Sequence, residues 1–395
     1  MASPFGGVAA WPLFLSGFRP FYLLGALYAP LLSLGGAGAL AGLVELPASL
    51  GAVLWHGHEM LYGFASAIVV GTLLTALPSW AGTPECRGAP LAALACAWLL
   101  GRAAFWGSPW LPASWVAAAD LLLYPALIVV LAPALWRAPN RWYRLLLPIL
   151  LALALANLAY HLAVRAGDAQ ATLTALHAAV WALVVLFTLK GGVLTPVFTG
   201  NALRELGRGT VLRTLLPLEA AALIVLIGLA CADLMQAPRW LSGGLALACA
   251  GVHGVRVARW RGWRVADQPL LPSMHLGFVW LLVAFVLKAV ADLTGWVPEA
   301  AWLHAFTVGA LGLMMLGLMT RVSLRHTGRA LRVPPALRAA AFVIFAAAAL
   351  RLAATVHGLG PWAVALAALL WAGAFFAYLE RFAGVLIAPS LPRSP

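Results

Sequence analysis

The chain has 395 residues, of which 64% are apolar and only 9% are charged, and this composition excludes a water-soluble globular domain. The net charge of +13 does not indicate nucleic-acid binding, because the basic residues lie in short loops between apolar runs, as in membrane proteins. Backbone groups in lipid must be satisfied within helices. The sequence therefore predicts an all-α polytopic membrane protein in a lipid bilayer, with no nucleic-acid partner.

Apolar runs bounded by Pro, Gly or Arg predict about twelve transmembrane helices, each near the roughly 20 residues that cross a bilayer. The predicted spans are 20–44, 54–79, 88–107, 112–136, 143–166, 172–197, 213–235, 239–259, 270–295, 300–322, 333–357 and 360–384. The connections are short. We therefore expect a single integral membrane domain over residues 1–395.

Arginines alternate between the loops and predict the orientation. They cluster after spans four, six, eight and ten, at Arg137, Arg141, Arg144, Arg204, Arg208, Arg213, Arg256, Arg259, Arg261, Arg264, Arg321, Arg325, Arg329, Arg332 and Arg338. The opposite loops carry Arg165 and Arg239. By the positive-inside rule, both termini are cytoplasmic.

This orientation places six of the nine histidines at one depth, near the outer face. They are His56 and His58 at the start of span two, His161 at the end of span five, His177 and His304 at the starts of spans six and ten, and His357 at the end of span eleven. Imidazole is a common ligand of iron and copper. Several of these residues are therefore predicted to bind haem or a metal ion.

A weak internal repeat relates three of these helices. Glycines follow His58 and His304 by 13 residues, at Gly71 and Gly317, and Lys190 follows His177 at the same spacing. The histidines lie on spans two, six and ten. The pattern suggests three four-helix arcs around a common axis, although glycine and histidine frequency alone explains it equally well.

The segment from Trp55 to Met60 (WHGHEM) concentrates polar groups at the head of span two. Residues two apart lie about 200° apart around a helix, so His56 and His58 face nearly opposite ways and one helix can serve two centres. An unwound first turn would instead let both bind one ion. Glu59 is a candidate proton donor or metal-site carboxylate, or it fixes the tautomer of a histidine. Tyr62, on the His58 face, is the other catalytic candidate.

Other polar residues within the spans are candidates to support this site. Asn157 precedes His161 by four residues on one helix face. Arg102 and Asp120 are candidates to reach haem propionates or water. Lys288 and Asp292 are spaced to form an ion pair.

Four sequence blocks resemble the NnrS family of bacterial inner-membrane proteins. They are residues 14–21 (FLSGFRPF), 55–64 (WHGHEMLYGF), 191–201 (GGVLTPVFTGN), and 304–310 (HAFTVGA) continued by 320–323 (TRVS) and 326–329 (HTGR). In the third block the family commonly has Arg where this chain has Val193. Any role of that Arg does not transfer, and Lys190 is a candidate replacement for its charge.

The resemblance implies a multi-pass protein of the bacterial inner membrane that handles nitric oxide. It also implies non-covalent, b-type haem, with copper or a second iron or haem. A looser likeness, to the main subunit of haem-copper oxidases and nitric oxide reductases, rests on twelve helices with histidines at the outer depth.

Three hypotheses follow for the function. In the first, haem and a second metal held by His56, His58, His161, His177, His304 and His357 bind nitric oxide and reduce it to nitrous oxide, with Glu59 relaying protons. Electrons then come from quinol or a separate redox protein. In the second, the protein binds haem and nitric oxide without turnover, as a sensor or protective protein. In the third, it transports a metal or haem.

Overall fold

The computed structural model of the chain describes residues 11–47, 51–82, 84–210 and 213–392. Within these residues the regular structure is helical, with no strand, and twelve helices are long and apolar enough to cross a membrane. The prediction of an all-α polytopic membrane protein with twelve spans is confirmed. The orientation of the spans stays a prediction of the charge pattern.

The described residues form two compact units. The first comprises the chain up to Ala182 together with Arg321–Leu331 and the segment from Phe375 onwards, and the second comprises Leu183–Thr320 and Arg332–Ala374. Three helices contribute residues to both units, namely α9 (Ala169–Leu186), α15 (Gly312–His326) and α17 (Gly360–Ile387). The single membrane domain expected for residues 1–395 stays a prediction.

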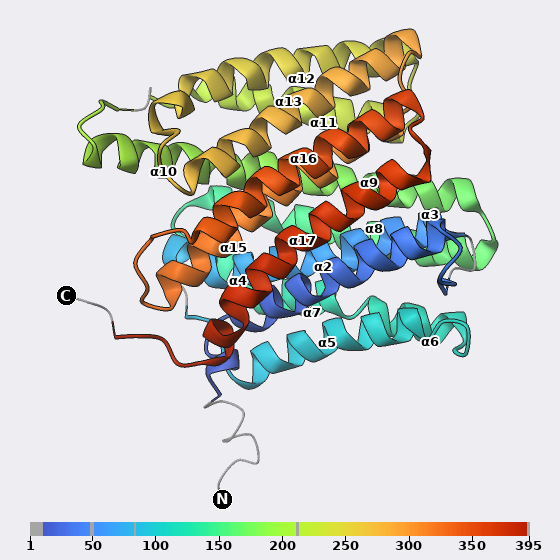
Figure 1. Cartoon of the computed structure of the whole chain (residues 1–395), viewed down its shortest axis with the longest axis horizontal. Coiled ribbons are helices and arrows are strands. Elements are labelled where there is room, and N and C mark those ends of the chain that lie inside the picture. The colour runs from blue at the N-terminus through green and yellow to red at the C-terminus, as the bar shows by residue number, and fades with distance from the viewer. Residues whose placement is uncertain (1–10, 48–50, 83, 211–212, 393–395) are drawn as a thin grey trace, which may run out of the picture. The chain divides into compact units, whose positions relative to one another are not determined.

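The first unit contains the spans predicted as one to five, coloured blue to green in Figure 1. Its elements are η1 (Pro12–Phe14), α2 (Phe18–Leu40), α3 (Ala52–His58), η2 (Glu59–Ala65), α4 (Ser66–Ala81), α5 (Ala89–Trp106), α6 (Ala113–Asp120), α7 (Leu123–Arg137), η3 (Arg141–Leu145) and α8 (Leu146–Ala166).

The second unit contains spans seven to nine and span eleven, most of spans six and ten, and part of span twelve. Its remaining elements are η4 (Phe187–Gly191), α10 (Gly192–Glu205), α11 (Leu216–Leu234), α12 (Arg239–Arg259), η5 (Gly262–Val265), α13 (Leu271–Thr294), α14 (Ala300–His304), η6 (Ala305–Leu311) and α16 (Pro335–His357). Within this unit α12 and α13 pack side by side (Figure 1).

Local sequence explains where the spans begin and end. A proline occupies the first turn of α5, α11, α13 and α16, where its missing N–H costs no hydrogen bond. Gly167 and Gly358 end α8 and α16 with φ of 71° and 64°, a left-handed conformation that favours glycine. Span four was predicted as one helix, but it breaks between α6 and α7, directly after Asp120.

Spans two, six and ten share two features. Each contains a π-helix, η2, η4 or η6, in which the turn is wider than in an α-helix. Their most apolar windows are 78%, 72% and 72% buried within the protein, against at most 50% for the other nine. These three helices are therefore the most buried of the twelve, as expected if they are the equivalent members of a repeat. The arrangement in three arcs stays a prediction.

Candidate functional site

His58 is the last residue of α3, and its imidazole is enclosed by polar groups in the first unit. Its Nδ1 lies 3.0 Å from Glu59 Oε1, while its Nε2 lies 3.1 Å from Asp120 Oδ2 and 3.0 Å from Asn157 Oδ1. The side chains of His58 and Glu59 are fully buried. All three neighbours of the ring nitrogens are oxygen atoms that accept hydrogen bonds or bind cations.

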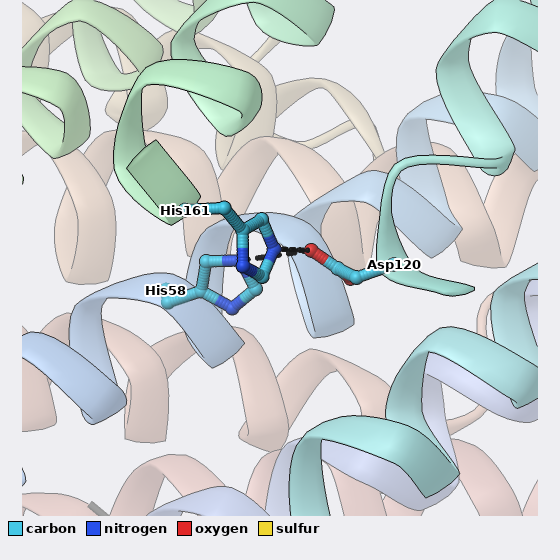
Figure 2. A group of neighbouring side chains, drawn as sticks. All are labelled: His58, Asp120 and His161. Atoms are coloured by element: carbon cyan, nitrogen blue, oxygen red, sulfur yellow. Dashed lines mark hydrogen bonds and ion pairs between the residues drawn. The ribbon is translucent and has the colours of Figure 1, made fainter. Parts of the chain in front are cut away.

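Asp120 is the centre of this cluster. Its Oδ2 lies 2.8 Å from His161 Nε2 and accepts a hydrogen bond of 2.8 Å from Asn157 Nδ2. Figure 2 shows the imidazoles of His58 and His161 lying next to each other and facing the Asp120 carboxylate. Because Asp120 ends α6, the break in span four places its carboxylate between α3 and α8.

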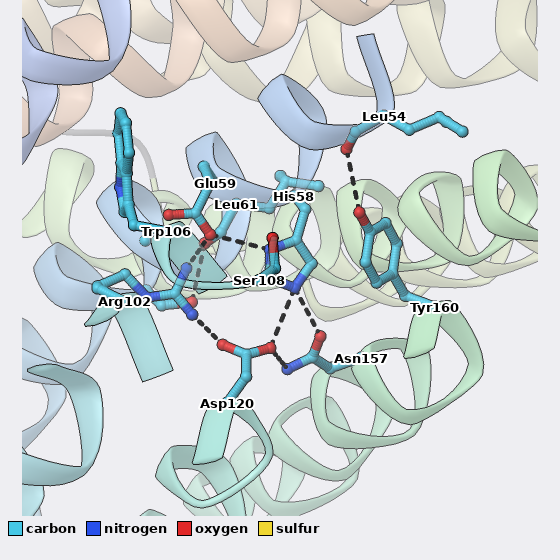
Figure 3. Close-up of polar contacts among 12 residues, drawn as sticks. Leu54, His58, Glu59, Leu61, Arg102, Trp106, Ser108, Asp120, Asn157 and Tyr160 are labelled. Carbon is cyan, nitrogen blue, oxygen red and sulfur yellow. Dashed lines mark hydrogen bonds and ion pairs between the residues drawn. The ribbon is translucent and has the colours of Figure 1, made fainter. Parts of the chain in front are cut away.

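Arg102 of α5 binds both carboxylates of the cluster. Its two terminal nitrogens donate to Glu59 and to Asp120, as Figure 3 shows. Glu59 also accepts a hydrogen bond from the Tyr28 hydroxyl, and Trp106 Nε1 donates to that hydroxyl at 2.7 Å. Glu59 thus accepts from a guanidinium, a phenol and an imidazole, as an ionised carboxylate does.

Aromatic rings cover the remaining surface of His58. The Phe105 ring stacks on the imidazole with centroids 4.1 Å apart and planes 7° apart. Tyr160 and Tyr62 lie at centroid distances of 4.4 and 4.9 Å. These rings keep the site apolar apart from its directed polar groups, which strengthens every electrostatic interaction inside it.

The buried charges do not balance without an additional positive charge. Glu59 and Asp120 supply two carboxylates, and Arg102 supplies one guanidinium. Unpaired charge in a low-dielectric interior is costly. The cluster therefore needs either a proton on an imidazole or a bound cation, and the cation would meet two imidazoles and a carboxylate.

The donor set at Asp120 fits a metal ion. One ligand atom each from His58, Asp120 and His161 lies within 4.8 Å of the others. The imidazole nitrogens of His58 and His161 lie 3.1 and 2.8 Å from Asp120 Oδ2, so the three donors converge on one point. Two histidines with one carboxylate are also the ligand set of non-haem iron sites.

The same surroundings do not fit haem at His58. Both ring nitrogens already face protein oxygens, and Phe105 covers one face of the ring. The cavity that Asp120 and Arg102 line measures about 10 Å³, which is roughly the room for one water molecule. The cluster therefore fits a metal ion and a small molecule rather than a macrocycle.

The other predicted ligands lie outside this cluster. His56 is half-buried beside α2, where a Cβ on Gly36 would lie 3.6 Å from its Nδ1. His177 is half-buried on α9, His304 ends α14, and His357 is the exposed last residue of α16. Haem binding by these four residues stays a prediction.

Tyr62, the second catalytic candidate, packs beside His58 but points its hydroxyl away from the charges. The hydroxyl donates to the Leu153 carbonyl at 3.0 Å. The Tyr62 ring forms part of the lining of the cavity beside Asp120. A catalytic role for Tyr62 stays a prediction.

Sequence reasoning missed Tyr28 and Trp106. Tyr28 donates to Glu59 and Trp106 donates to the Tyr28 hydroxyl, yet they lie on α2 and α5, outside the WHGHEM segment. In a chain with 18 Trp and 7 Tyr, composition gives no signal for these two. A contact between the helices was needed to find them.

Gly63 lets Tyr28 reach Glu59, and this gives a testable prediction. A Cβ at Gly63 would lie 2.4 Å from Tyr28 Cε1, so Gly63→Ala is expected to displace the Tyr28 ring and to destabilise the protein by about 1–3 kcal/mol. Thermal unfolding in detergent measures this. Gly251→Ala on α12 is the matched control, because no atom lies within 4 Å of the added carbon. Equal unfolding temperatures for the two variants would contradict the packing argument.

A second buried ion-pair cluster occupies the outer half of unit two, by the predicted orientation. Lys288 Nζ lies 3.0 Å from Asp292 Oδ1, so the predicted pair is confirmed. Asp233 and Glu299 approach the same nitrogen at 2.5 and 3.4 Å. The Lys288 side chain is 3% exposed, and these carboxylates offset the cost of burying its ammonium group.

A positive charge from another helix, that of Arg256, lies beside the third sequence block, residues 191–201. Val193, at the position where Arg is common, is exposed. The buried Arg256 of α12 instead lies against Gly192 and donates to the Thr188 carbonyl at 3.2 Å and to Glu219 Oε2 at 2.8 Å. Lys190 is half-buried within η4.

The comparison with known families agrees with this architecture. The chain matches the family model described as NnrS protein over residues 12–390. No curated protein matches the chain. The family match covers nearly all of the twelve-helix membrane protein and includes the His58 cluster, and the chain belongs to the NnrS family.

Proposed function

We propose that this protein handles nitric oxide at a metal centre held by His58, Asp120 and His161, and that it reduces the gas to nitrous oxide. Membership of the NnrS family supports a membrane protein of the nitric oxide response. The observation that carries the site is the buried cluster of two imidazoles and two carboxylates with one guanidinium. A transition-metal ion bound there supplies a coordination position for nitric oxide.

The residues around the ligands hold them in place. Glu59 accepts a hydrogen bond from the Nδ1–H group of His58 and thereby directs Nε2 toward Asp120. Many metal-binding histidines are oriented in this way. Asn157 fixes Asp120 through its amide nitrogen. Arg102 holds both carboxylates at once. We therefore assign Glu59 to positioning His58 rather than to proton donation.

The reaction must balance in electrons and protons. Two molecules of nitric oxide, two electrons and two protons give one nitrous oxide and one water. We propose a quinol or a reduced redox protein as the electron donor. The cavity lined by Asp120, Arg102 and Tyr62 has room for about one water-sized molecule, which suits a diatomic gas and no larger substrate.

Purified protein in detergent tests the proposal. We expect about one transition-metal ion per chain by mass spectrometry, a change in its electron paramagnetic resonance signal with nitric oxide, and nitrous oxide formation with a reduced quinol. Nitric oxide binding without nitrous oxide would support the non-catalytic alternative. Metal uptake into proteoliposomes without stable binding would support a transporter. Haem is measured in the same samples, because His56, His177, His304 and His357 remain candidates for it.

Glu59→Gln tests the positioning role. Loss of the carboxylate behind His58 is expected to weaken metal binding about 10–100-fold and to change the resonance signal of the bound ion, because the imidazole loses its fixed orientation. Titration with a competing chelator measures the affinity. Glu219→Gln on α11 removes a carboxylate that pairs with Arg256 and is the control. Unchanged affinity and spectrum in Glu59→Gln would exclude this role.

A further inference from the structure

The helices that carry His58 and His304 are built alike. The π-helices η2 and η6 begin directly after these histidines and are 7 residues long in both cases. Gly63 and Gly309 stand at the same position within them, five residues after the histidine. The glycines that follow by 13 residues complete the pattern seen in the sequence.

The neighbouring helices repeat as well. A Cβ on Gly63 would lie 2.4 Å from Tyr28 of α2, and one on Gly309 would lie 2.5 Å from Trp280 of α13. At both positions glycine admits an aromatic ring of the preceding span against the π-helix. Span one therefore packs against span two in the same way as span nine packs against span ten.

A second pair of glycines, three residues before each aromatic ring, strengthens this relation. Gly25 on α2 packs against the Ile68 side chain, and a Cβ on Gly277 of α13 would lie 3.0 Å from the Ala310 carbonyl oxygen and 3.6 Å from the Met314 backbone nitrogen. Ile68 and Met314 both lie ten residues after their histidine. The matched contacts show that spans one and two correspond to spans nine and ten.

Spans one to three form the first set, and spans nine to eleven form the second. The third helix of each set carries a buried or half-buried arginine near the histidine end of the π-helix. In the first set, Arg102 is neutralised by Glu59 and Asp120. In the other set, Arg351 of α16 takes this place, and the residue after the histidine is Ala305 instead of a glutamate. The second set therefore has no carboxylate at the position directly after its histidine.

Arg351 has neutral partners within the part of the chain that the structure describes. Its Nη2 lies 3.1 Å from His304 Nε2, and its Nη1 donates to Thr355 Oγ1 at 2.6 Å. His304 Nδ1 donates to the Ala300 carbonyl at 2.7 Å, so Nε2 is the acceptor and the imidazole is neutral. The guanidinium therefore keeps its full positive charge without a carboxylate.

A charge in this position calls for a counter-ion. Arg351 lies in a span of mean hydropathy 2.1, where an unpaired charge is expensive. Two of the five N–H groups of a guanidinium are used by His304 and Thr355, and the Arg351 side chain is half-buried. The planar fork of a guanidinium suits carboxylates and other oxyanions.

We propose that Arg351, held in place by His304 and Thr355, binds the oxyanion group of a ligand that the chain itself does not supply. The site goes beyond the metal centre proposed above and does not depend on it. A free small anion and the phosphate of an anionic lipid share this chemistry. The missing counterpart of Glu59 at Ala305 is the reason that the anion must come from outside.

Titration of the purified full-length protein with nitrite and with formate tests the free-anion source. Isothermal calorimetry on lipid-stripped protein is expected to show saturable binding that weakens roughly tenfold or more in Arg351→Gln, the factor for losing a charge-assisted hydrogen bond. Arg338→Gln removes an exposed arginine of the same helix and is the control. Binding that survives equally in both variants would overturn the proposal.

The lipid source is tested in vesicles. If the phosphate of a lipid is the ligand, wild-type protein retains phosphatidylglycerol in preference to phosphatidylcholine, and Arg351→Gln loses this preference while the free anions bind weakly. The absence of both nitrite or formate binding and phosphatidylglycerol preference in the wild type would overturn the proposal. Thermal unfolding of each variant confirms that it is folded.

Ala305→Glu tests the repeat behind the proposal. The new carboxylate stands where Glu59 stands in the first set, so it is expected to neutralise Arg351 internally and to abolish binding of the added anion. If this variant does not fold, the comparison of Arg351→Gln with Arg338→Gln still decides the proposal. A folded Ala305→Glu protein that binds the anion as the wild type does would contradict it.

Discussion

If the proposed metal ion binds at Asp120, replacement of His161 by alanine is expected to remove it from the purified protein while leaving the protein folded. His161 Nε2 lies 2.8 Å from Asp120 Oδ2 and is one of three donors in the cluster. Loss of a residue that only hydrogen-bonds to a metal ligand lowers the metal affinity roughly 10–100-fold. Loss of a ligand itself is expected to lower the affinity at least as much. The small imidazole cavity left on α8 does not unpair the buried charges of Arg102.

The measurement is metal content after dialysis against a weak chelator, with the nitric oxide signal recorded on the same samples. Circular dichroism and thermal unfolding report the fold. His253→Ala is the matched control, because it removes a buried imidazole of α12 that packs against Phe285. Full metal content in His161→Ala would place the ion elsewhere, and equal loss in both variants would make the effect one of folding.

The fold and the site around Asp120 show which features can be predicted from the sequence. Hydropathy alone predicts twelve spans, because a helix that crosses lipid needs a long apolar run whatever its neighbours are. The spacing of Asn157 and His161 also follows from one helix face, and both side chains meet Asp120. The residues that share one face of a helix can therefore be predicted from their spacing.

Contacts between helices are not predictable in this way. Six histidines share one predicted depth, yet only His58 and His161 meet at Asp120 among the residues that the structure describes. Depth does not specify rotation about the helix axis, which decides the partners. Glu59 lies 3.0 Å from the ring of His58, the residue directly before it, and this contact at the start of a π-helix does not follow from positions on an α-helical wheel.

Arg102 is expected to be the residue whose loss destabilises the first unit most directly. Arg102→Met leaves Glu59 and Asp120 buried without their shared counter-charge, and breaking a buried ion pair in this way costs about 3–5 kcal/mol. The variant is therefore expected to unfold at a much lower temperature in detergent. Arg208→Met is the control, since its ion pair with Asp267 is exposed and contributes little.

A double variant separates the charge effect from the loss of packing. Arg102→Met combined with Glu59→Gln removes one charge of each sign, so it is expected to recover part of the stability that Arg102→Met alone loses. Thermal unfolding of the two single variants, the double variant and the wild type gives the coupling between the residues. A double variant as unstable as the sum of the single ones would show that Arg102 acts through packing, and the balance of charges would then not explain why this guanidinium lies between two carboxylates.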